Sequence, residues 1–366
     1  MIRRSSVAEP LQSSSSPTLR LVLVGLGFWG GSWIRVIRES RHCALVALVD
    51  TDEAALGRAA SAADIQSEEC FASIADAVEA IRADAALIVV PPAAHARVAL
   101  EALECGLHCL IEKPFASTLE DARLITERAD SVGRVVMVSQ QYRYRDGAQT
   151  VKRLIDAGAV GRIGVVHISF SNVLPVPGFQ LQMEEPLLWD MAIHHFDLIR
   201  GILGVEPVRV QATSYNPSWS EFAGNAATTA VFESENGTTI TYAGSWAPRG
   251  GVTGWDGVWE ILGEDGAIHW DGNDVILRPL ARPLIAKIQR RALKREWKGQ
   301  RIKLTPVGEA DRLGSLAEFS AAIWGNRQPE TSGRDNIRSL ALTVAAVESV
   351  RRRTAVDVAE LLGVGR

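Results

Sequence analysis

The stretch that most constrains the fold is 19–30, which reads LRLVLVGLGFWG. An apolar run of strand length, 21–24, leads directly into a G-x-G-x-x-G turn, and a segment with helical character follows over 32–39. A buried strand, such a turn and a helix together make up the dinucleotide-binding fingerprint. The sequence therefore predicts an α/β unit whose first strand ends at a phosphate-binding turn, where the helix N-terminus presents free N–H groups.

Each glycine of this turn has a physical role. Gly25 permits the tight turn, Gly27 lets the backbone approach a pyrophosphate, and Gly30 lets the helix pack closely on the strand. A second apolar run, 44–49, ends in Asp50, where an acidic side chain would accept hydrogen bonds from the adenosine ribose. Because Asp50 stands at the expected spacing, we favour a dinucleotide site over a glycine-rich turn that binds nothing.

Asp50 also predicts which dinucleotide is bound. A carboxylate that accepts a hydrogen bond from the ribose 2′-hydroxyl repels a 2′-phosphate. Thr51 and Asp52 bring no positive charge beside it, although Arg41 and Arg58 are close enough in sequence to turn toward the site. We expect NAD, with NADP the less favoured alternative.

The composition sets outer limits on the function. A chain of 366 residues is long enough for two domains. The 39 Lys and Arg residues against 43 Asp and Glu give no electrostatic case for nucleic acid or an anionic membrane. No apolar run is long enough to span a bilayer, and the four cysteines lack metal-site spacing. These features fit a cytoplasmic protein in a reducing compartment.

The first part of the chain alternates strands and helices, which predicts a parallel, doubly wound sheet with right-handed crossovers. The strands beyond 44–49 are expected at 84–90, 108–111 and 134–138, and the helices at 52–63, 73–82, 94–104 and 118–131. Ligands of such sheets bind beyond the carboxyl ends of the strands. Pro91-Pro92 and Glu112-Lys113-Pro114 lie at such ends, as Asp50 and the glycine turn do.

The pattern changes after Tyr144, and from 208 to 277 strand-like runs follow one another without helices, which predicts a large, mainly antiparallel open sheet. Asn236-Gly237 is a strong hairpin turn between two of these runs. The runs are 163–170, 208–213, 227–233, 238–244, 258–262, 267–270 and 275–277, and helices are expected at 147–157, 186–203, 313–324, 335–352 and 356–362. The basic stretch 282–303 is read as a solvated surface segment.

We therefore expect α/β architecture in three parts. Residues 1–18 form a disordered tail, and residues 19–145 form a dinucleotide-binding domain of the Rossmann type. Residues 146–366 form an α+β domain for substrate binding and subunit association, whose last helices could pack back on the first domain.

Two segments carry residues suited to chemistry. A lysine at a strand end, Lys113, can act as an acid or base, or can polarise a substrate oxygen, although from the tripeptide alone a lysine in a surface loop is the better interpretation. In the second segment Asp190, His194 and Asp197 share one face of a helix, and His195 points roughly 100° away. The spacing fits an acid/base histidine, a divalent metal site or a structural polar cluster, and does not choose among them.

Taken together, these motifs resemble the Gfo/Idh/MocA oxidoreductase family, named for glucose–fructose oxidoreductase, inositol dehydrogenase and MocA. The matches run in order from about residue 19 onward and include IVVPPAAH at 88–95, GLHCLIEKP at 106–114 and VSQQYRY at 138–144. Two departures stand out. The residues 185–189 replace the paired glycines that often precede the histidine helix, and Val90 replaces a common threonine. The first departure leaves the substrate class open, because that loop borders the substrate.

The resemblance implies a set of site residues and a site that works without metal. Lys113, His194 and Asp190 are the implied catalytic residues, with proton transfer assigned to Lys113 and His194. We expect His194 to titrate near neutrality and Asp190, on the same helix face, to favour its protonated form. The implied cofactor-binding residues are Gly25, Gly27, Phe28, Trp29, Gly30, Asp50, Pro91, Pro92, His95, Glu112 and Lys113. The implied substrate-binding residues are Lys113, Arg143, Asp190, His194 and Asp197. The resemblance also implies a homo-oligomer, a dimer or a tetramer, paired through the open sheet.

The function expected from this resemblance is hydride transfer between a nicotinamide cofactor and a sugar, cyclitol or related polyol. A glycosidase that retains NAD and oxidises its substrate transiently is one alternative. A regulator that binds dinucleotide and sugar without catalysis is another, and the presence of Lys113 and His194 argues against it. The sequence leaves open the substrate, the direction of reaction and which of the two residues is the base.

Overall fold

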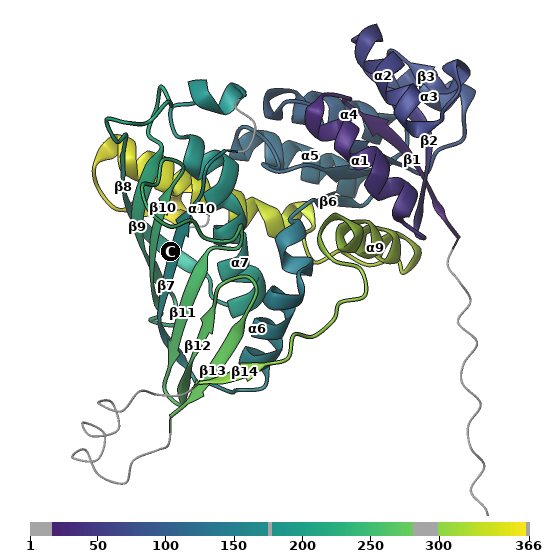
Figure 1. The fold of residues 1–366 in the computed structure, drawn as a ribbon. Coiled ribbons are helices and arrows are strands. Elements are labelled where there is room, and N and C mark those ends of the chain that lie inside the picture. The colour runs from purple at the N-terminus through teal and green to yellow at the C-terminus, as the bar shows by residue number, and fades with distance from the viewer. Residues whose placement is uncertain (1–16, 175–177, 281–298, 364–366) are drawn as a thin grey trace, which may run out of the picture.

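The computed structural model describes residues 17–174, 178–280 and 299–363, and its architecture is α/β with two separate sheets (Figure 1). Most of the expected tail, up to residue 16, and most of the basic stretch, residues 282–298, lie outside the described residues. The first sheet is parallel, as the alternating sequence predicts. Its six strands lie in the order β3-β2-β1-β4-β5-β6. They are β1 (Leu19–Val24), β2 (Cys43–Val49), β3 (Cys70–Phe71), β4 (Ala85–Ile88), β5 (His108–Ile111) and β6 (Val136–Val138).

The strand order reverses between β1 and β4, and this is the point where ligands of doubly wound sheets bind. Ser73 and Thr118 cap two of the covering helices, because their hydroxyls accept hydrogen bonds from Asp76 N and Asp121 N. The helices are α1 (Phe28–Glu39), α2 (Glu53–Ala63), α3 (Ile74–Ala80), α4 (His95–Glu104) and α5 (Leu119–Ser131). The sequence analysis missed three strands, 70–71 in this sheet and 300–302 and 356–357 in the second sheet, and each has only two or three residues, too few for a pattern to show.

The second sheet has nine strands in the order β14-β13-β12-β11-β7-β10-β9-β8-β15. It is mainly antiparallel, as expected, but β7 and β10 at its centre run parallel. These strands are β7 (Ile163–Ser171), β8 (Pro207–Tyr215), β9 (Ala227–Ser234), β10 (Thr239–Ser245), β11 (Val258–Gly263), β12 (Gly266–Trp270), β13 (Val275–Pro279), β14 (Gln300–Ile302) and β15 (Val356–Asp357). Along β9 the exposed Val231 and Glu233 alternate with the buried Ala230 and Phe232, so one face of this sheet is open to solvent.

Helices cover the other face of the nine-stranded sheet (Figure 1). They are α6 (Asp146–Asp156), α7 (Ile193–Leu203), α10 (Gly333–Arg352) and α11 (Val358–Leu362). The expected single helix over 186–203 consists of two parts, a π-helix over Leu187–Ala192 followed by α7. This change of helix type determines how the polar residues at the centre of the molecule are arranged.

The chain returns to the first sheet near its end. Helix α9 (Asp311–Trp324) lies against the parallel sheet, where Leu316 and Phe319 join the core that contains Leu21 and Trp33. Just before α10, Thr331 pairs with the free edge of β6, because Val138 N donates to Thr331 O at 2.8 Å. The parallel sheet is therefore completed by residues from the C-terminal part of the chain.

Candidate active site

The glycine turn between β1 and α1 has the geometry of a phosphate cradle. Gly25 has φ +89°, and a Cβ there would lie 2.6 Å from Val89 O. A Cβ on Gly30 would lie 1.9 Å from Gly25 O, so only glycine fits where the helix meets the strand. A Cβ on Gly27, in contrast, would meet nothing within 4 Å, which leaves open space at the N-terminus of α1. This space and the uncapped helix N-terminus fit the pyrophosphate of a dinucleotide.

Asp50 closes the same turn from the end of β2. Its carboxylate accepts hydrogen bonds from Leu26 N at 2.6 Å and from Asp52 N at 3.0 Å. The two nearby arginines are paired with other carboxylates, Arg41 with Glu309 at 3.1 Å and Arg58 with Asp52 at 4.0 Å. A ribose hydroxyl beside Asp50 would therefore meet a negative charge.

Glu112, at the end of β5, is buried beneath two indole rings. Its Oε1 accepts hydrogen bonds from Trp29 Nε1 at 2.8 Å and Trp33 Nε1 at 2.9 Å, and its Oε2 accepts one from Lys113 N at 3.0 Å. Sequence analysis included Trp29 but missed Trp33. The spacing of four residues on one helix was the available signal, because it places both indoles on the same face.

The loop that begins with Pro91 and Pro92 is tied to the loop after β5 by His95. This ring is buried, with Nε2 2.9 Å from Val90 O and Nδ1 2.9 Å from Pro114 O. Burial lowers the pKa of His95. His95 is therefore buried between the two loops and ties one to the other.

Lys113 and Asp190 join the two halves of the molecule. Lys113 Nζ donates to Asp190 Oδ1 at 3.0 Å and to the backbone carbonyl of Asp190 at 2.8 Å. The two side chains are 14% and 19% exposed, so the pair is largely shielded yet still reaches solvent. The sequence analysis expected Asp190 to assist His194 instead. Asp190 belongs to the π-helix and His194 to α7, and the wider π turn changes the alignment that α-helical spacing predicts.

His194 is buried at the junction of the two halves. Its Nδ1 lies 3.1 Å from Gln140 Oε1, and its ring stacks on Tyr142 at 4.3 Å between centroids with 10° between the planes. The pKa of His194 lies well below its ordinary value because the ring is desolvated and because Lys113 and other positive groups face it. The expectation that His194 titrates near neutrality is therefore wrong. That expectation assumed that Asp190 would contact His194, whereas in the structure Asp190 pairs with Lys113.

Arg143 and Asp197, both expected to bind substrate, bind each other. Arg143 donates to the two carboxylate oxygens of Asp197 at 2.6 and 2.7 Å, and Asp197 also accepts a hydrogen bond from Ser339 at 2.6 Å. The two side chains are 7% and 1% exposed. Arg143 reaches Asp335 on α10 as well, so this network fastens α7 and α10 to the segment after β6. An arginine and an aspartate on different elements could bind a ligand or could pair with each other. The sequence does not distinguish these two roles.

His195 points away from His194, as helical spacing predicts, and lies in the packing between α7 and the nine-stranded sheet. Its Nε2 lies 3.0 Å from Trp255 O and its Nδ1 3.3 Å from the Tyr242 hydroxyl. Burial lowers the pKa of His195 to about 4. The sequence analysis missed Gln140, the partner of His194. Its position directly after β6, at the end of a parallel strand, was the available signal.

Comparison with known proteins identifies the chain. Residues 19–140 match the model of an oxidoreductase family with an NAD-binding Rossmann fold, and residues 148–269 match the C-terminal domain of the same family. The chain belongs to the Gfo/Idh/MocA oxidoreductase family. As a family member, it shares the parallel dinucleotide-binding sheet and the large second sheet described above.

Among curated relatives of this Gfo/Idh/MocA protein, the chain is 26% identical to D-apiose dehydrogenase of Paraburkholderia graminis, covering 93% of this chain and 89% of the relative. It is 25% identical to inositol 2-dehydrogenase of Rhizobium meliloti, covering 93% and 100%. An oxidoreductase from Agrobacterium radiobacter, solved with NAD+, L-tartaric acid and magnesium, has the same fold with a TM-score of 0.82 at 21% identity. That match covers 94% of this chain and 100% of the solved one.

Two features are absent from the described residues, a metal-binding cluster and a membrane-spanning helix. These residues contain no group of three or more His, Cys, Asp or Glu side chains arranged to hold a metal ion. No helix in the described ranges is long and apolar enough to cross a membrane. Independence from metal stays a prediction that an experiment has to test.

Proposed function

We propose that this Gfo/Idh/MocA protein is an NAD-dependent dehydrogenase that acts on a hydroxyl group of a sugar, cyclitol or related polyol. The observation that carries the proposal is that Lys113, paired with Asp190, lies close enough to the buried His194 to lower its pKa, at the junction between the two sheets. Relatives named as sugar and cyclitol dehydrogenases, aligned over nearly the whole chain, support this substrate class.

The residues around the glycine turn fit the cofactor. Gly25, Gly27 and Gly30 with the first residues of α1 would hold the pyrophosphate, and Asp50 would accept hydrogen bonds from the adenosine ribose. Glu112 is fixed by two indoles and would bind the nicotinamide ribose. When bound, the oxidised nicotinamide accepts the hydride from the substrate carbon.

Lys113 is suited to stabilise negative charge on the substrate oxygen. An ammonium group has three N–H donors, and Asp190 takes two of them. The third would donate to the substrate hydroxyl, lowering its effective pKa and stabilising an alkoxide as it develops. His194, neutral because of its lowered pKa, would then accept the hydroxyl proton.

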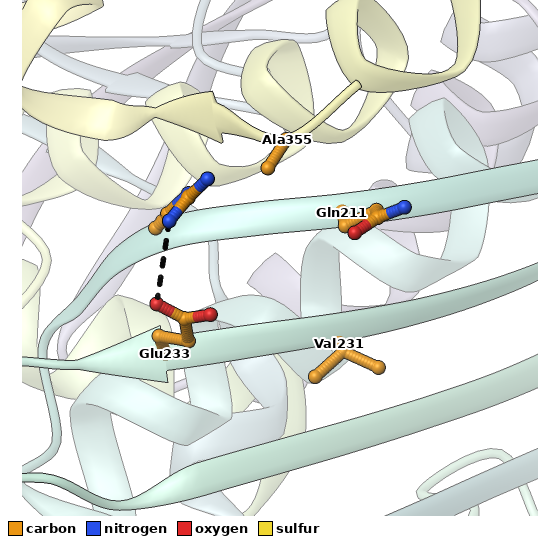
Figure 2. Close-up of a pocket in the computed structure, with 5 residues that line it drawn as sticks. Gln211, Val231, Glu233 and Ala355 are labelled. Carbon is orange, nitrogen blue, oxygen red and sulfur yellow. Dashed lines mark ion pairs between the residues drawn. The ribbon is translucent and has the colours of Figure 1, made fainter. Parts of the chain in front are cut away.

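The proposal includes a cytoplasmic homo-oligomer. The four cysteines are unpaired, which suits a reducing compartment. The outer face of the nine-stranded sheet is open, and Figure 2 shows a shallow hollow on it, lined by Gln211, Val231, Glu233 and Ala355, with Arg209 3.9 Å from Glu233. A second copy pairing through this face would cover the hollow. Light scattering at micromolar concentration should report a dimer or tetramer, and a monomer would contradict this part.

The proposed function is tested with a panel of sugars and cyclitols, each supplied with NAD or NADP, by following the absorbance of the reduced nicotinamide. We expect substrate-dependent reduction of NAD that Lys113→Ala abolishes. The matched control is Lys152→Ala, because Lys152 lies on α6 and pairs only with Asp156 among its described partners. Cleavage of a glycoside by protein that retains its NAD, with no net reduction, would replace the proposal with the glycosidase alternative.

A further inference from the structure

We propose that Gln140 is a positioning residue for proton transfer, whose amide oxygen holds His194 in the tautomer with its hydrogen on Nδ1. This tautomer leaves the Nε2 lone pair to accept the proton of the substrate. The inference rests on the proposed function, and it chooses the base between Lys113 and His194, a choice that the sequence leaves open.

The contact between the two side chains sets the tautomer. Gln140 follows β6 directly, and its Oε1 lies 3.1 Å from His194 Nδ1. An amide oxygen only accepts hydrogen bonds, so Nδ1 has to be the donor. A neutral imidazole carries a single N–H, and Nε2 is therefore an acceptor. Gln140 is 1% exposed, and its Nε2 has no partner among the described residues, so within that part of the chain the bond to His194 orients this amide.

The plane of the imidazole is fixed independently. One face of Tyr142 stacks on His194 at 4.3 Å, and the Arg145 guanidinium carbon lies 3.4 Å from the centroid of the same ring. Two groups so close to one centroid have to lie on opposite faces. Arg145 is itself held by Asp256 at 3.0 Å and Asp311 at 2.8 Å. The stack fixes the plane of the ring, and Gln140 decides which ring nitrogen carries the hydrogen.

The surrounding charges decide which group is the base. Burial together with Lys113, His195 and Arg145 lowers the pKa of His194, and the carboxylate of Asp190 is paired with Lys113. Lys113 is an ammonium with no lone pair, whereas neutral His194 has one on Nε2. In the oxidation direction the hydroxyl proton moves to Nε2, the hydrogen on carbon leaves as hydride to the oxidised nicotinamide, and the C–O bond becomes C=O.

Two substitutions at position 140 separate this role from simple packing. In Gln140→Glu the carboxylate also accepts from Nδ1, so the tautomer is kept and kcat above neutrality should stay within a few-fold. The added negative charge stabilises the imidazolium and raises the pKa of His194, so the acidic limb of the kcat profile should move to higher pH. Gln140→Met has similar volume but no acceptor, and should lower kcat about ten-fold or more with little change in NADH affinity.

The opposite ranking would overturn the proposal. If the amide were reversed, with its Nε2 donating to Nδ1, a carboxylate at position 140 would force the wrong tautomer. Gln140→Glu would then be the damaged variant and Gln140→Met the mild one.

A second measurement needs no substrate. Two-bond 15N–1H correlations of 15N-histidine-labelled protein distinguish the two tautomers, and the signals of His194 are those lost in His194→Gln. We expect Nδ1–H in the wild type and a shift toward Nε2–H in Gln140→Met. Gln141→Met is the matched control, because Gln141 is the buried neighbour and its Oε1 has no described partner. Wild-type Nε2–H would refute the inference even if dehydrogenase activity is found, and wild-type Nδ1–H would stand even if the substrate panel fails.

Discussion

Lys113 Nζ lies 3.0 Å from Asp190 Oδ1, and this ion pair joins the end of a parallel strand to a π-helix 77 residues further along the chain. The bond holds the Lys113 side chain in place, and it takes up the carboxylate that helical spacing assigned to His194. The two groups available for proton transfer are therefore in opposite states, a cation and a neutral ring. Such a division of roles is what the oxidation of an alcohol requires.

Loss of either group should affect turnover more than cofactor binding. Lys113→Ala and His194→Ala should each lower kcat by roughly 10²-fold or more, the usual scale for an acid/base group. The affinity for NADH, measured by fluorescence titration, should change little. His195→Ala, on the other side of α7, should lose much less activity. A dead His195 variant beside an active His194 variant would reverse the assignment.

The cofactor preference should depend on Asp50. The wild type should bind NADH more tightly than NADPH, because Asp50 carries a negative charge where a 2′-phosphate would lie. Asp50→Ser should narrow the difference, and titration with both reduced cofactors measures it. Glu53→Ser, on the exposed first turn of α2, is the control and should leave the preference unchanged. Tighter binding of NADPH by the wild type would contradict the prediction.

The buried ion pair between Arg143 and Asp197 should be a stability determinant. Arg143→Met leaves the Asp197 charge buried without its main partner and should lower the free energy of unfolding by about 3–5 kcal/mol. The double variant Arg143→Met with Asp197→Leu should recover part of this loss, because no unpaired charge remains. Denaturant unfolding of the single and double variants checks it. A single variant as stable as the wild type would mean that the pair has a different role, such as binding substrate.

Stability should fall as the solution becomes acidic, in part because of His195. Its pKa in the folded state is about 4, below the ordinary 6.5, so the unfolded chain binds more protons between these values. The contribution of His195 to the free energy of unfolding is complete above pH 6.5 and decreases as the pH falls toward 4. Between pH 7 and pH 5.5 the wild type should lose on the order of 1 kcal/mol through this group. His195→Gln, which cannot titrate, should show a correspondingly smaller loss in urea unfolding at the two pH values.

Activity should not require a divalent metal ion. Lys113 and His194 supply the proton transfer and the cofactor takes the hydride. Dialysis against a chelator should leave kcat unchanged. Activity that disappears on dialysis and returns with a divalent ion would overturn the prediction, and the Asp190 region would then need a different explanation.

The sequence predicted the architecture well because the strand and helix patterns are periodic. The glycine turn, between a buried strand and a helix, is also typical of one kind of fold, the dinucleotide-binding sheet. It predicted the inner arrangement of the site less well. Nothing in 187–192 distinguishes a π-helix from an α-helix, so the partner of Asp190 was assigned to the wrong residue. Arg143 and Asp197 have the charges of ligand-binding residues, and only the fold shows that they face each other. Gln140 carries no charge, and although it lies in the matched segment 138–144, only the coordinates show its contact with His194.

The helix that returns to the parallel sheet has a consequence for recombination between relatives. Leu316 and Phe319 of α9 share a hydrophobic core with Leu21 and Trp33, far apart in the gene but adjacent in space. In a chimaera joined at position 145, the parallel sheet of one protein would have to pack against α9 of another. A fragment that ends at position 145 would lack α9 and expose the apolar surface that α9 covers. The unit that can be exchanged intact is therefore discontinuous, 19–145 together with 311–324.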